Sequence, residues 1–338
     1  MNYEEAENIP GMIELVERNM LFSILNSLDI EQEDSIVEFG PFFGRSTNCI
    51  AQGLIANRKY DPGCKFYTYD SFECDENGWF APHLIGRAKA GGVEHLLERD
   101  KGKISFDKIF SYYMKSYLDS KTVIFVKKQI VESQPPSNTI AFIHIDSPKF
   151  FEEFKIILYR FFPQTKIGSV IVFQDFFYEW SATIILPITI LAEKGYLMLE
   201  SSAATSLVCR IIKVPKKNDL QEIETIMSKD EECGKYFDIA IQSCKKIKLD
   251  RAESYLPRLT LARIQWLYSR GHYQTARKTI VNYLKEGNPF QLKLVDNFLD
   301  LLANGFSIRH LFEKDHSNDE IPTLADAGKF EKNDEKQK

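Results

Sequence analysis

Short apolar runs alternate with helical stretches from Ser35 to about Lys213. Several of these runs lack polar alternation, as expected for strands that helices cover on both faces. The expected strands are Ser35–Phe39, Phe66–Asp70, Thr122–Val126, Thr139–Asp146, Ser169–Asp175, Tyr196–Ser201 and Ser206–Lys213. The alternation predicts an α/β fold with a doubly wound, mostly parallel sheet of seven strands.

The last two expected strands are separated by only a short turn-like stretch. This spacing predicts an antiparallel hairpin at the edge of the sheet. A dinucleotide-binding fold normally lacks such a hairpin, so the hairpin argues for a different doubly wound fold over residues 1–213.

After this domain the sequence becomes charged and then helical. Residues 214–235 are charged and weakly apolar, which predicts a linker with one exposed helix, and residues 236–312 predict an all-α extension. Within the extension, Leu261–Arg277 resembles one tetratricopeptide-type helix–turn–helix, with Gly271 at the turn and Ala276 at a close helix contact. One such unit cannot bury its faces alone. It therefore packs on the sheet domain or on a second subunit, or belongs to a peptide-binding array.

Composition excludes several classes of protein. The 338 residues carry a formal net charge of −5, with a pI near 5.8, which argues against a broad nucleic-acid surface. No apolar run approaches the roughly 20 residues that span a bilayer, and the acidic start lacks a signal-peptide pattern. The six cysteines form no C-x-x-C pair, which favours reduced thiols in a cytoplasmic protein. The charged tail, residues 313–338, is expected to be disordered.

A glycine turn follows the first expected strand, in the order Glu38-Phe39-Gly40-Pro41-Phe42-Phe43-Gly44-Arg45-Ser46. Glycine lets a backbone approach a bound nucleotide closely. The spacing matches neither a dinucleotide fingerprint nor a phosphate loop. The motif is either a ligand-binding turn or an ordinary strand–turn–helix junction with two glycines.

Three acids stand at expected strand ends, where ligands bind in open α/β sheets. Asp70 can accept hydrogen bonds from both hydroxyls of a ribose, with Phe72 placed to cover an adenine, or it caps the next helix. Asp146 and Asp175 can converge on one hard divalent cation if their strands are neighbours. The aromatic and glycine-rich stretch after Glu73 forms either a lid or a surface insertion.

The E-x-G-x-x-x-G spacing resembles the first motif of class I S-adenosylmethionine-dependent methyltransferases, whose fold has the edge hairpin. The block from Ile140 to Trp180 resembles the sugar O-methyltransferases related to macrocin O-methyltransferase. In that family a strand ends in His-x-Asp-x-Asp, and a later strand begins with glycine and ends in Asp-Asp. The matching positions are His144, Asp146, Gly168 and Asp175.

The resemblance implies a Rossmann-like methyltransferase fold, S-adenosylmethionine as cofactor, and Mg²⁺ as a further cofactor. The residues expected to bind the cofactor are Glu38, Gly40, Gly44, Ser46, Asp70 and Phe72. His144 and Asp146 are the expected catalytic residues, with a buried structural histidine as the alternative for His144. Asp146 and Asp175 are the expected metal ligands. Two positions depart from the pattern: Pro148 stands where the family carries an acid, and Gln174 replaces the first acid of the Asp-Asp pair.

Two functions remain open. One is an O-methyltransferase that acts on a small hydroxylated substrate, such as a sugar or sugar-nucleotide. The other is a catalytically degenerate protein that keeps the fold as a ligand-binding or protein-interaction module. No nucleic acid or membrane is expected as a partner. The C-terminal helices are candidates for self-association or for binding a protein partner.

Overall fold

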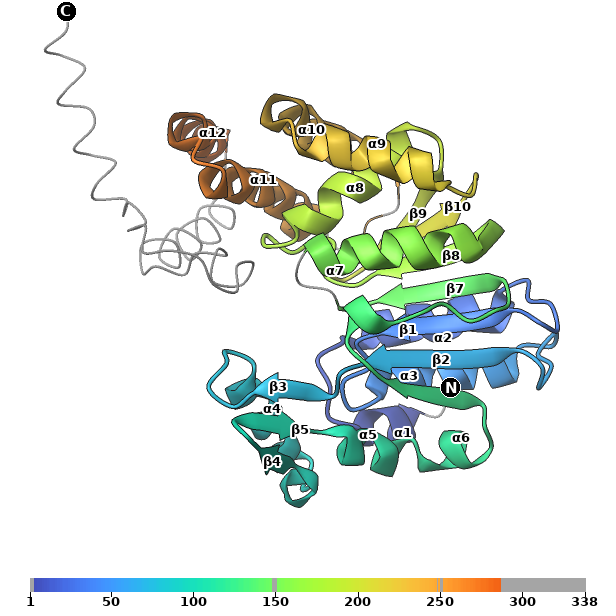
Figure 1. Ribbon diagram of the computed structural model, residues 1–338. Helices are drawn as coiled ribbons and strands as arrows, with labels where there is room; N and C mark the ends of the chain where they lie inside the picture. Colours follow the sequence, from blue (N-terminus) through green and yellow to red (C-terminus); the bar gives the residue numbers. More distant parts are fainter. Residues whose placement is uncertain (1–2, 148–150, 248, 250–251, 287–338) are drawn as a thin grey trace, which may run out of the picture.

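The computed structural model describes residues 3–147, 151–247, 249 and 252–286. Its centre is a seven-stranded sheet in the order β6-β2-β1-β7-β8-β10-β9 (Figure 1). The strands are β1 (Ser35–Phe39), β2 (Lys65–Asp70), β6 (Val123–Lys127), β7 (Ile140–Ile145), β8 (Thr165–Phe173), β9 (Leu197–Ala203) and β10 (Ser206–Ile211). All seven predicted strands are present. β10 pairs antiparallel with both β8 and β9, which confirms the predicted hairpin.

Helices cover both faces of this sheet, as the apolar strands required. Successive residues of a strand point to opposite faces, so Ile36 belongs to one core cluster while Val37 and Phe39 belong to the other. The first cluster includes buried residues of α1 (Tyr3–Asn8), α2 (Leu15–Ser27), α3 (Arg45–Ala56), α5 (Asp107–Tyr113) and α6 (Lys115–Asp119). The second includes residues of α7 (Phe151–Ile156) and α8 (Ala182–Glu193). Short helical turns span Glu94–Leu96, Ile130–Glu132, Ile157–Phe161 and Phe162–Gln164.

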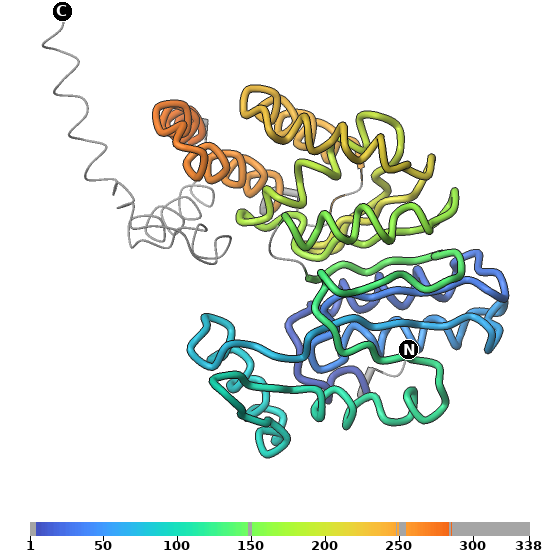
Figure 2. Tube along the Cα trace, viewed as in Figure 1, coloured from blue at the N-terminus to red at the C-terminus, as the bar shows by residue number. Residues whose placement is uncertain are grey.

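An insertion follows β2 at the carboxyl side of the sheet (Figures 1 and 2). It contains a second, three-stranded antiparallel sheet in the order β3-β5-β4. Its elements are β3 (Glu73–Asp75), α4 (Ala81–Ala90), β4 (Glu98–Asp100) and β5 (Lys103–Ser105). These short strands were not predicted, because three residues are too few to give a hydrophobic period.

The segment predicted as a charged linker with one exposed helix packs on the sheet. Residues 214–235 include α9 (Lys217–Met227), and Leu220 and Ile223 of this helix lie in the same core cluster as β8 and α8. α10 (Asp230–Cys244) also packs on α8. The charged composition therefore reflects the solvent-facing side of helices that belong to the sheet domain.

The predicted helix–turn–helix is present as α11 (Ala252–Ser269) and α12 (Tyr273–Glu286). Gly271 has φ +80° at the turn, and Ala276 is buried between the helices, as predicted. α11 packs against α8 and α10, and its Leu259 belongs to the core cluster of the sheet domain. Of the predicted extension, residues 287–312 lie outside the described residues, as does the predicted disordered tail.

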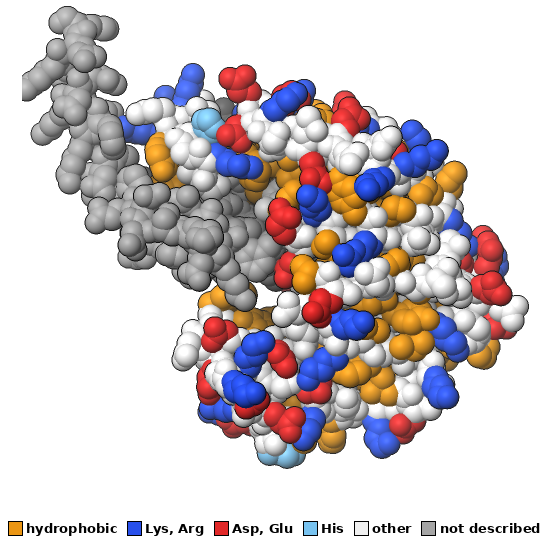
Figure 3. Space-filling model, viewed as in Figure 1, with side chains coloured by type: hydrophobic (Ala, Val, Ile, Leu, Met, Phe, Trp, Pro, Cys, Tyr) orange, Lys and Arg blue, Asp and Glu red, His pale blue; other side chains and the backbone are white. Residues whose placement is uncertain are grey.

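Acidic and basic side chains are interspersed over the face drawn in Figure 3, with apolar side chains between them. Within the described ranges, no helix combines the length and the apolar character that a membrane span needs. All six cysteines are free thiols.

Candidate active site at the carboxyl edge of the sheet

Backbone hydrogen bonds continue one residue beyond the parallel strands and align their ends. The bonds run from the Gly40 nitrogen to the Tyr69 oxygen (3.0 Å), from Asp146 to Phe39 (3.0 Å) and from Gln174 to Ile145 (2.9 Å). They place the ends of β2, β1, β7 and β8 side by side, in that order. The structure therefore brings Asp70, Gly40, Asp146 and Asp175 to one edge, where each residue is half-buried.

Asp70 is a half-buried acid at this edge whose pKa is shifted. Its Oδ1 accepts a hydrogen bond from the Phe72 nitrogen at 2.7 Å. Burial raises the pKa of Asp70 to about 6, although that hydrogen bond opposes the shift, and the charge of Glu38 raises the pKa further. A carboxylate with so little solvation gains from hydroxyl groups that donate to it. This donor requirement fits the paired hydroxyls of a ribose, and hence the expected cofactor.

The two glycines of the turn are explained first by protein contacts. Gly40 has φ +80°, and a Cβ there would lie 2.9 Å from the Ser147 nitrogen. Gly44 has φ +98°, and a Cβ there would lie 2.8 Å from the Met114 side chain. The turn therefore needs glycine to let β7 and α5 approach. Gly40 is half-buried and borders the edge, whereas Gly44 is buried.

Glu38 does not reach the edge. It has no exposed surface, and its Oε2 accepts a 2.6 Å hydrogen bond from Thr47. Its Oε1 lies 3.1 Å from the Nδ1 of His144. Glu38 therefore ties β1 to α3 and to β7 in this structure, and its contact with the cofactor stays a prediction.

His144 is likewise a buried structural residue and not an accessible base. Burial lowers the pKa of His144, but the hydrogen bond that its Nδ1 makes to Glu38 and the charges of Glu38 and Asp146 outweigh burial and raise the pKa overall. The ring has no exposed surface, so an acceptor hydroxyl cannot reach it in this structure. Its Nε2 has no hydrogen-bond partner among the described residues.

Two further expected cofactor contacts are also inside the protein. Phe72 has φ +54° and no exposed surface, and its ring packs against Phe106, Phe110 and Phe125. It is therefore a core residue and does not cover a ligand here. Ser46 is buried in the first turn of α3.

The expected metal ligands lie on adjacent strands, but the set is incomplete. Asp146 and Asp175 follow β7 and β8, and Asp175 has φ +60°. Gln174 turns away from solvent: its Nε2 donates to Glu17 and its Oε1 accepts from Ser206. Across the part of the chain that the structure describes, no three His, Cys, Asp or Glu side chains could hold a cation together. Among the described residues, Asp146 and Asp175 are therefore the two acids that Mg²⁺ would meet at this edge, and Pro148 lies outside the described residues.

Glu17 on α2 is the buried acid that sequence reasoning missed. It lies one and two helical turns before Leu21 and Leu25, on the stripe that packs into the core. An acid in line with buried leucines was the signal available in the sequence, because such a side chain must find donors inside the protein.

The insertion contacts the glycine turn through aromatic rings. Phe42 has φ +52°, and its ring lies 5.7 Å from those of Phe80 and Phe106. Trp79, whose ring contacts that of Phe80, is 53% exposed. The insertion thus borders the glycine turn, where a lid would lie. It also has an exposed surface, so the lid and the surface insertion both stay open.

No family model and no curated protein matches the chain. Among solved structures it is similar to the O-methyltransferase NovP, with 16% identity, a TM-score of 0.40, and coverage of 62% of this chain and 80% of NovP. It is also similar to CalS11, described as a TDP-rhamnose 3'-O-methyltransferase. The identity is 15% and the TM-score 0.39, with coverage of 62% of this chain and 80% of CalS11. A third similar structure is the O-methyltransferase TomG from Streptomyces achromogenes, solved in complex with S-adenosylmethionine. The identity is 13% and the TM-score 0.33, with coverage of 62% of this chain and 89% of TomG.

The strand order decides the fold. A parallel sheet with a reversal between β2-β1 and β7-β8, closed by an antiparallel strand inserted before the last edge strand, is the class I methyltransferase arrangement. The chain has the methyltransferase fold. In this fold the row of half-buried residues from Asp70 to Asp175 lies where ligands bind.

Proposed function

We propose that this protein is an S-adenosylmethionine-dependent O-methyltransferase that acts on a small hydroxylated substrate, with a sugar or sugar-nucleotide as the substrate class. The observation that carries the proposal is Asp70, a poorly solvated acid beside the Gly40 turn in a methyltransferase fold. The sugar class is suggested by the match of His144, Asp146, Gly168 and Asp175 to the sugar O-methyltransferase pattern.

Asp70 would hold the cofactor through its ribose hydroxyls, and the half-buried backbone at Gly40 would border it. When bound, the cofactor supplies an electrophilic methyl group on a sulfonium sulfur. Asp146 lies on the other side of Gly40 and would orient the acceptor hydroxyl and take its proton. Neither His144 nor a metal ion has a part in this proposal.

Calorimetry with S-adenosylhomocysteine tests the cofactor. We expect the full chain to bind it and not to bind NAD. Asp70→Asn should weaken binding about 10- to 100-fold, because a charged acceptor of hydroxyl hydrogen bonds is lost. Asp29→Asn is the matched control, since Asp29 is an exposed acid at the opposite edge of the sheet. Binding of NAD instead would reject the proposal.

A panel of sugars and sugar-nucleotides, with mass spectrometry of the products, tests the reaction. Asp146→Asn should abolish transfer while leaving S-adenosylhomocysteine binding intact. Transfer that is unaffected by this substitution would remove the catalytic role of Asp146.

The alternative is a degenerate protein that binds the cofactor without turnover. The buried Gln174 favours it, because an acid of the family pattern is replaced and its substitute faces inward. Cofactor binding without transfer to any acceptor would support this alternative. A cytoplasmic location, and self-association or a protein partner at the C-terminal helices, remain parts of the proposal that sedimentation and fractionation would test.

A further inference from the structure

The segment of residues 177–180, which follows β8 at the carboxyl edge, is held by the C-terminal helix pair. The Phe177 ring is buried and lies 5.8 Å from the Tyr255 ring of α11. Trp180 packs against the apolar cluster that α11 and α12 form around Leu261. α11 lies on the carboxyl side of the sheet (Figure 1). A segment that borders the candidate site is therefore fixed by helices from a distant part of the chain.

Arg258 of α11 makes the polar contacts to this segment. Its guanidinium carbon lies 5.6 Å from the centre of the Tyr178 ring, within the range of a cation–π interaction. Its Nη1 lies 3.5 Å from the Glu179 Oε2. The side chains of Arg258 and Glu179 are 24% and 12% exposed, so water weakens their attraction less than at the surface. One arginine thus contacts two neighbouring side chains of the segment.

Tyr178 is the exposed side chain of this segment. It is 39% exposed, although Arg258 lies beside its ring. Its nitrogen donates to the Asp175 oxygen at 2.9 Å, so the two residues close a turn whose ends lie within about 7 Å of each other. An aromatic ring with a hydroxyl offers an apolar face and a polar tip. Such a side chain suits a hydroxylated ring, whose CH groups pack on aromatic faces while its hydroxyls bind polar groups.

We propose that Tyr178 is an acceptor-binding residue and that Arg258 positions its ring, so that the C-terminal helix pair completes the acceptor side of the site. The ligand class is a hydroxylated ring, such as that of a sugar. The inference rests on the proposed function, which places the acceptor hydroxyl at Asp146, after the strand that pairs with β8. Arg258 contacts protein groups and acts through Tyr178.

Hydrogen exchange of the full chain, followed by mass spectrometry, tests the role of Arg258. Arg258→Met removes the cation beside Glu179 and Tyr178. Exchange should become about tenfold faster in peptides that carry the Tyr178 and Ser181 amides, because the turns that these amides close lose their support. Unchanged exchange of these amides would overturn the proposal.

Two variants of α11 are the controls for this measurement. Arg263→Met breaks the ion pair with Asp238 on the same helix, and should leave the exchange of residues 177–181 unchanged. Arg258→Lys keeps the charge and should restore most of the protection. Peptides from β1 report global unfolding, and they should exchange equally slowly in every sample. If Arg263→Met accelerates the same amides, the effect comes from α11 as a whole and the positioning role fails.

Transfer to a panel of sugars and sugar-nucleotides tests the role of Tyr178. Tyr178→Ala should raise the KM of the acceptor about tenfold and change kcat by no more than about twofold, because the ring binds the acceptor without reacting. Tyr178→Phe keeps the ring and should recover most of that loss. Tyr273→Ala, which removes a similarly exposed tyrosine from α12, is the control. An unchanged KM in Tyr178→Ala would overturn the proposal.

A double variant tests whether Arg258 acts through Tyr178. Arg258→Met should raise the same KM, and Tyr178→Ala/Arg258→Met should be no worse than Tyr178→Ala alone. Additive effects would separate the two residues and overturn the positioning role. Calorimetry with S-adenosylhomocysteine distinguishes the hypotheses. A wild type that binds no S-adenosylhomocysteine and methylates no sugar rejects the proposed function, and the acceptor role with it, whereas the exchange rates judge Arg258 alone.

Discussion

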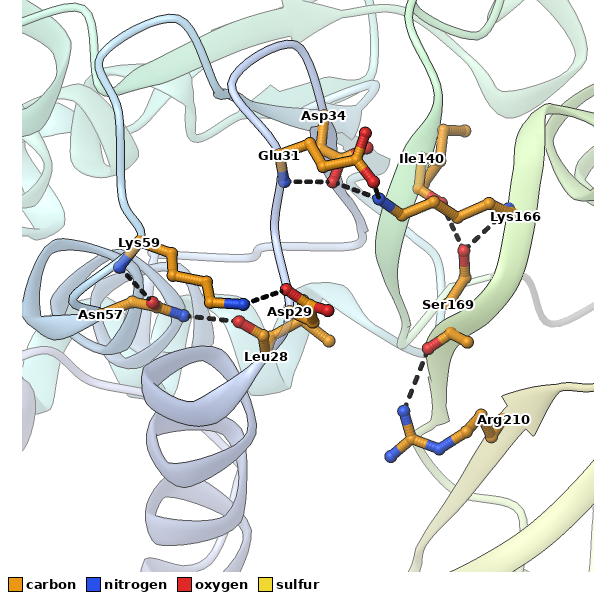
Figure 4. A network of polar contacts seen from close by, with 11 residues as sticks. Leu28, Asp29, Glu31, Asp34, Asn57, Lys59, Ile140, Lys166, Ser169 and Arg210 are labelled. Atoms are coloured by element: carbon orange, nitrogen blue, oxygen red, sulfur yellow. Dashed lines mark hydrogen bonds and ion pairs between the residues drawn. The ribbon is translucent and has the colours of Figure 1, made fainter.

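The amino edge and the carboxyl edge of the central sheet differ in how their acidic side chains are paired. At the amino edge the Lys166 Nζ lies 2.9 Å from the Glu31 Oε1 and 2.7 Å from the buried Asp34 Oδ2 (Figure 4). The Ser169 hydroxyl donates to the Ile140 oxygen at 2.7 Å in the same network. Opposite charges are paired there, and Lys59 lowers the pKa of Asp29.

At the carboxyl edge acids predominate. Burial raises the pKa of Asp70 to about 6 and also raises that of Glu17. Below this edge, the buried Glu38 is bound to a histidine rather than to a lysine or an arginine. A protein keeps acids in so little water where they do chemistry or hold other groups. The comparison teaches that the amino edge pairs its acids with lysines, while the raised pKa values of acids at the carboxyl edge fit the site proposed there.

The largest effect is expected at the amino edge. Lys166→Met removes the cation beside buried Asp34 and should reduce the free energy of unfolding by about 2 to 3 kcal/mol, since a buried charge loses its partner. Chemical denaturation measures this. Lys59→Met, which breaks an exposed pair at the same edge, should leave stability nearly unchanged. Equal losses would mean that burial does not distinguish the two pairs.

The next effect is in the glycine turn of the carboxyl edge. Gly40→Ala should destabilise by about 2 kcal/mol, because it combines a positive φ with a Cβ pressed against the Ser147 nitrogen. Gly195→Ala has a similar φ of +75° with open space around its Cβ, and should lose only about 1 kcal/mol. If thermal unfolding shows the same loss of stability for both variants, the contact between position 40 and Ser147 does not add to the destabilisation of Gly40→Ala.

A smaller effect is expected below the same edge, at the buried Glu38. Thr47→Val keeps the shape of the side chain but removes the 2.6 Å hydrogen bond, and should destabilise by about 1.5 kcal/mol. Thr47→Ser keeps the hydroxyl and is the control. A valine variant no less stable than the serine variant would show that Glu38 does not need this donor.

The smallest effect is a difference in pH dependence between the edges. The folded-state pKa of Asp70 is raised from 3.8 to about 6, so its favourable contribution is complete below pH 3.8 and is lost as pH rises through 6. The stability of the wild type relative to Asp70→Asn should therefore fall by about 1 kcal/mol over this window, after allowance for solvent screening. For Asp29, whose pKa is lowered, the difference should instead grow as pH rises. Denaturant titrations at several pH values measure both differences. If the Asp70 and Asp29 differences change with pH in the same direction, this contrast is contradicted.

Much of the fold could be read from hydrophobic periodicity. The run Ser35–Phe39 is strand β1 with the predicted bounds, and the Gly271 turn lies where predicted. The candidate site was read less well. Asp70, Asp146 and Asp175 reach one edge as expected. Phe72 was placed at a ligand because its position in sequence gave no sign that α5 and β6 would bury it.

The sequence by itself determined which residues form strands and helices, and that acids follow strands β2, β7 and β8, because those properties depend on local spacing. Only the tertiary structure decided which of these groups face solvent. Glu38 and His144 lie in the middle of a sheet covered on both faces and so bind each other, while Glu17 meets Gln174 across 157 positions of sequence. Pairing over such distances depends on how helices and strands pack in space, and no local pattern encodes it.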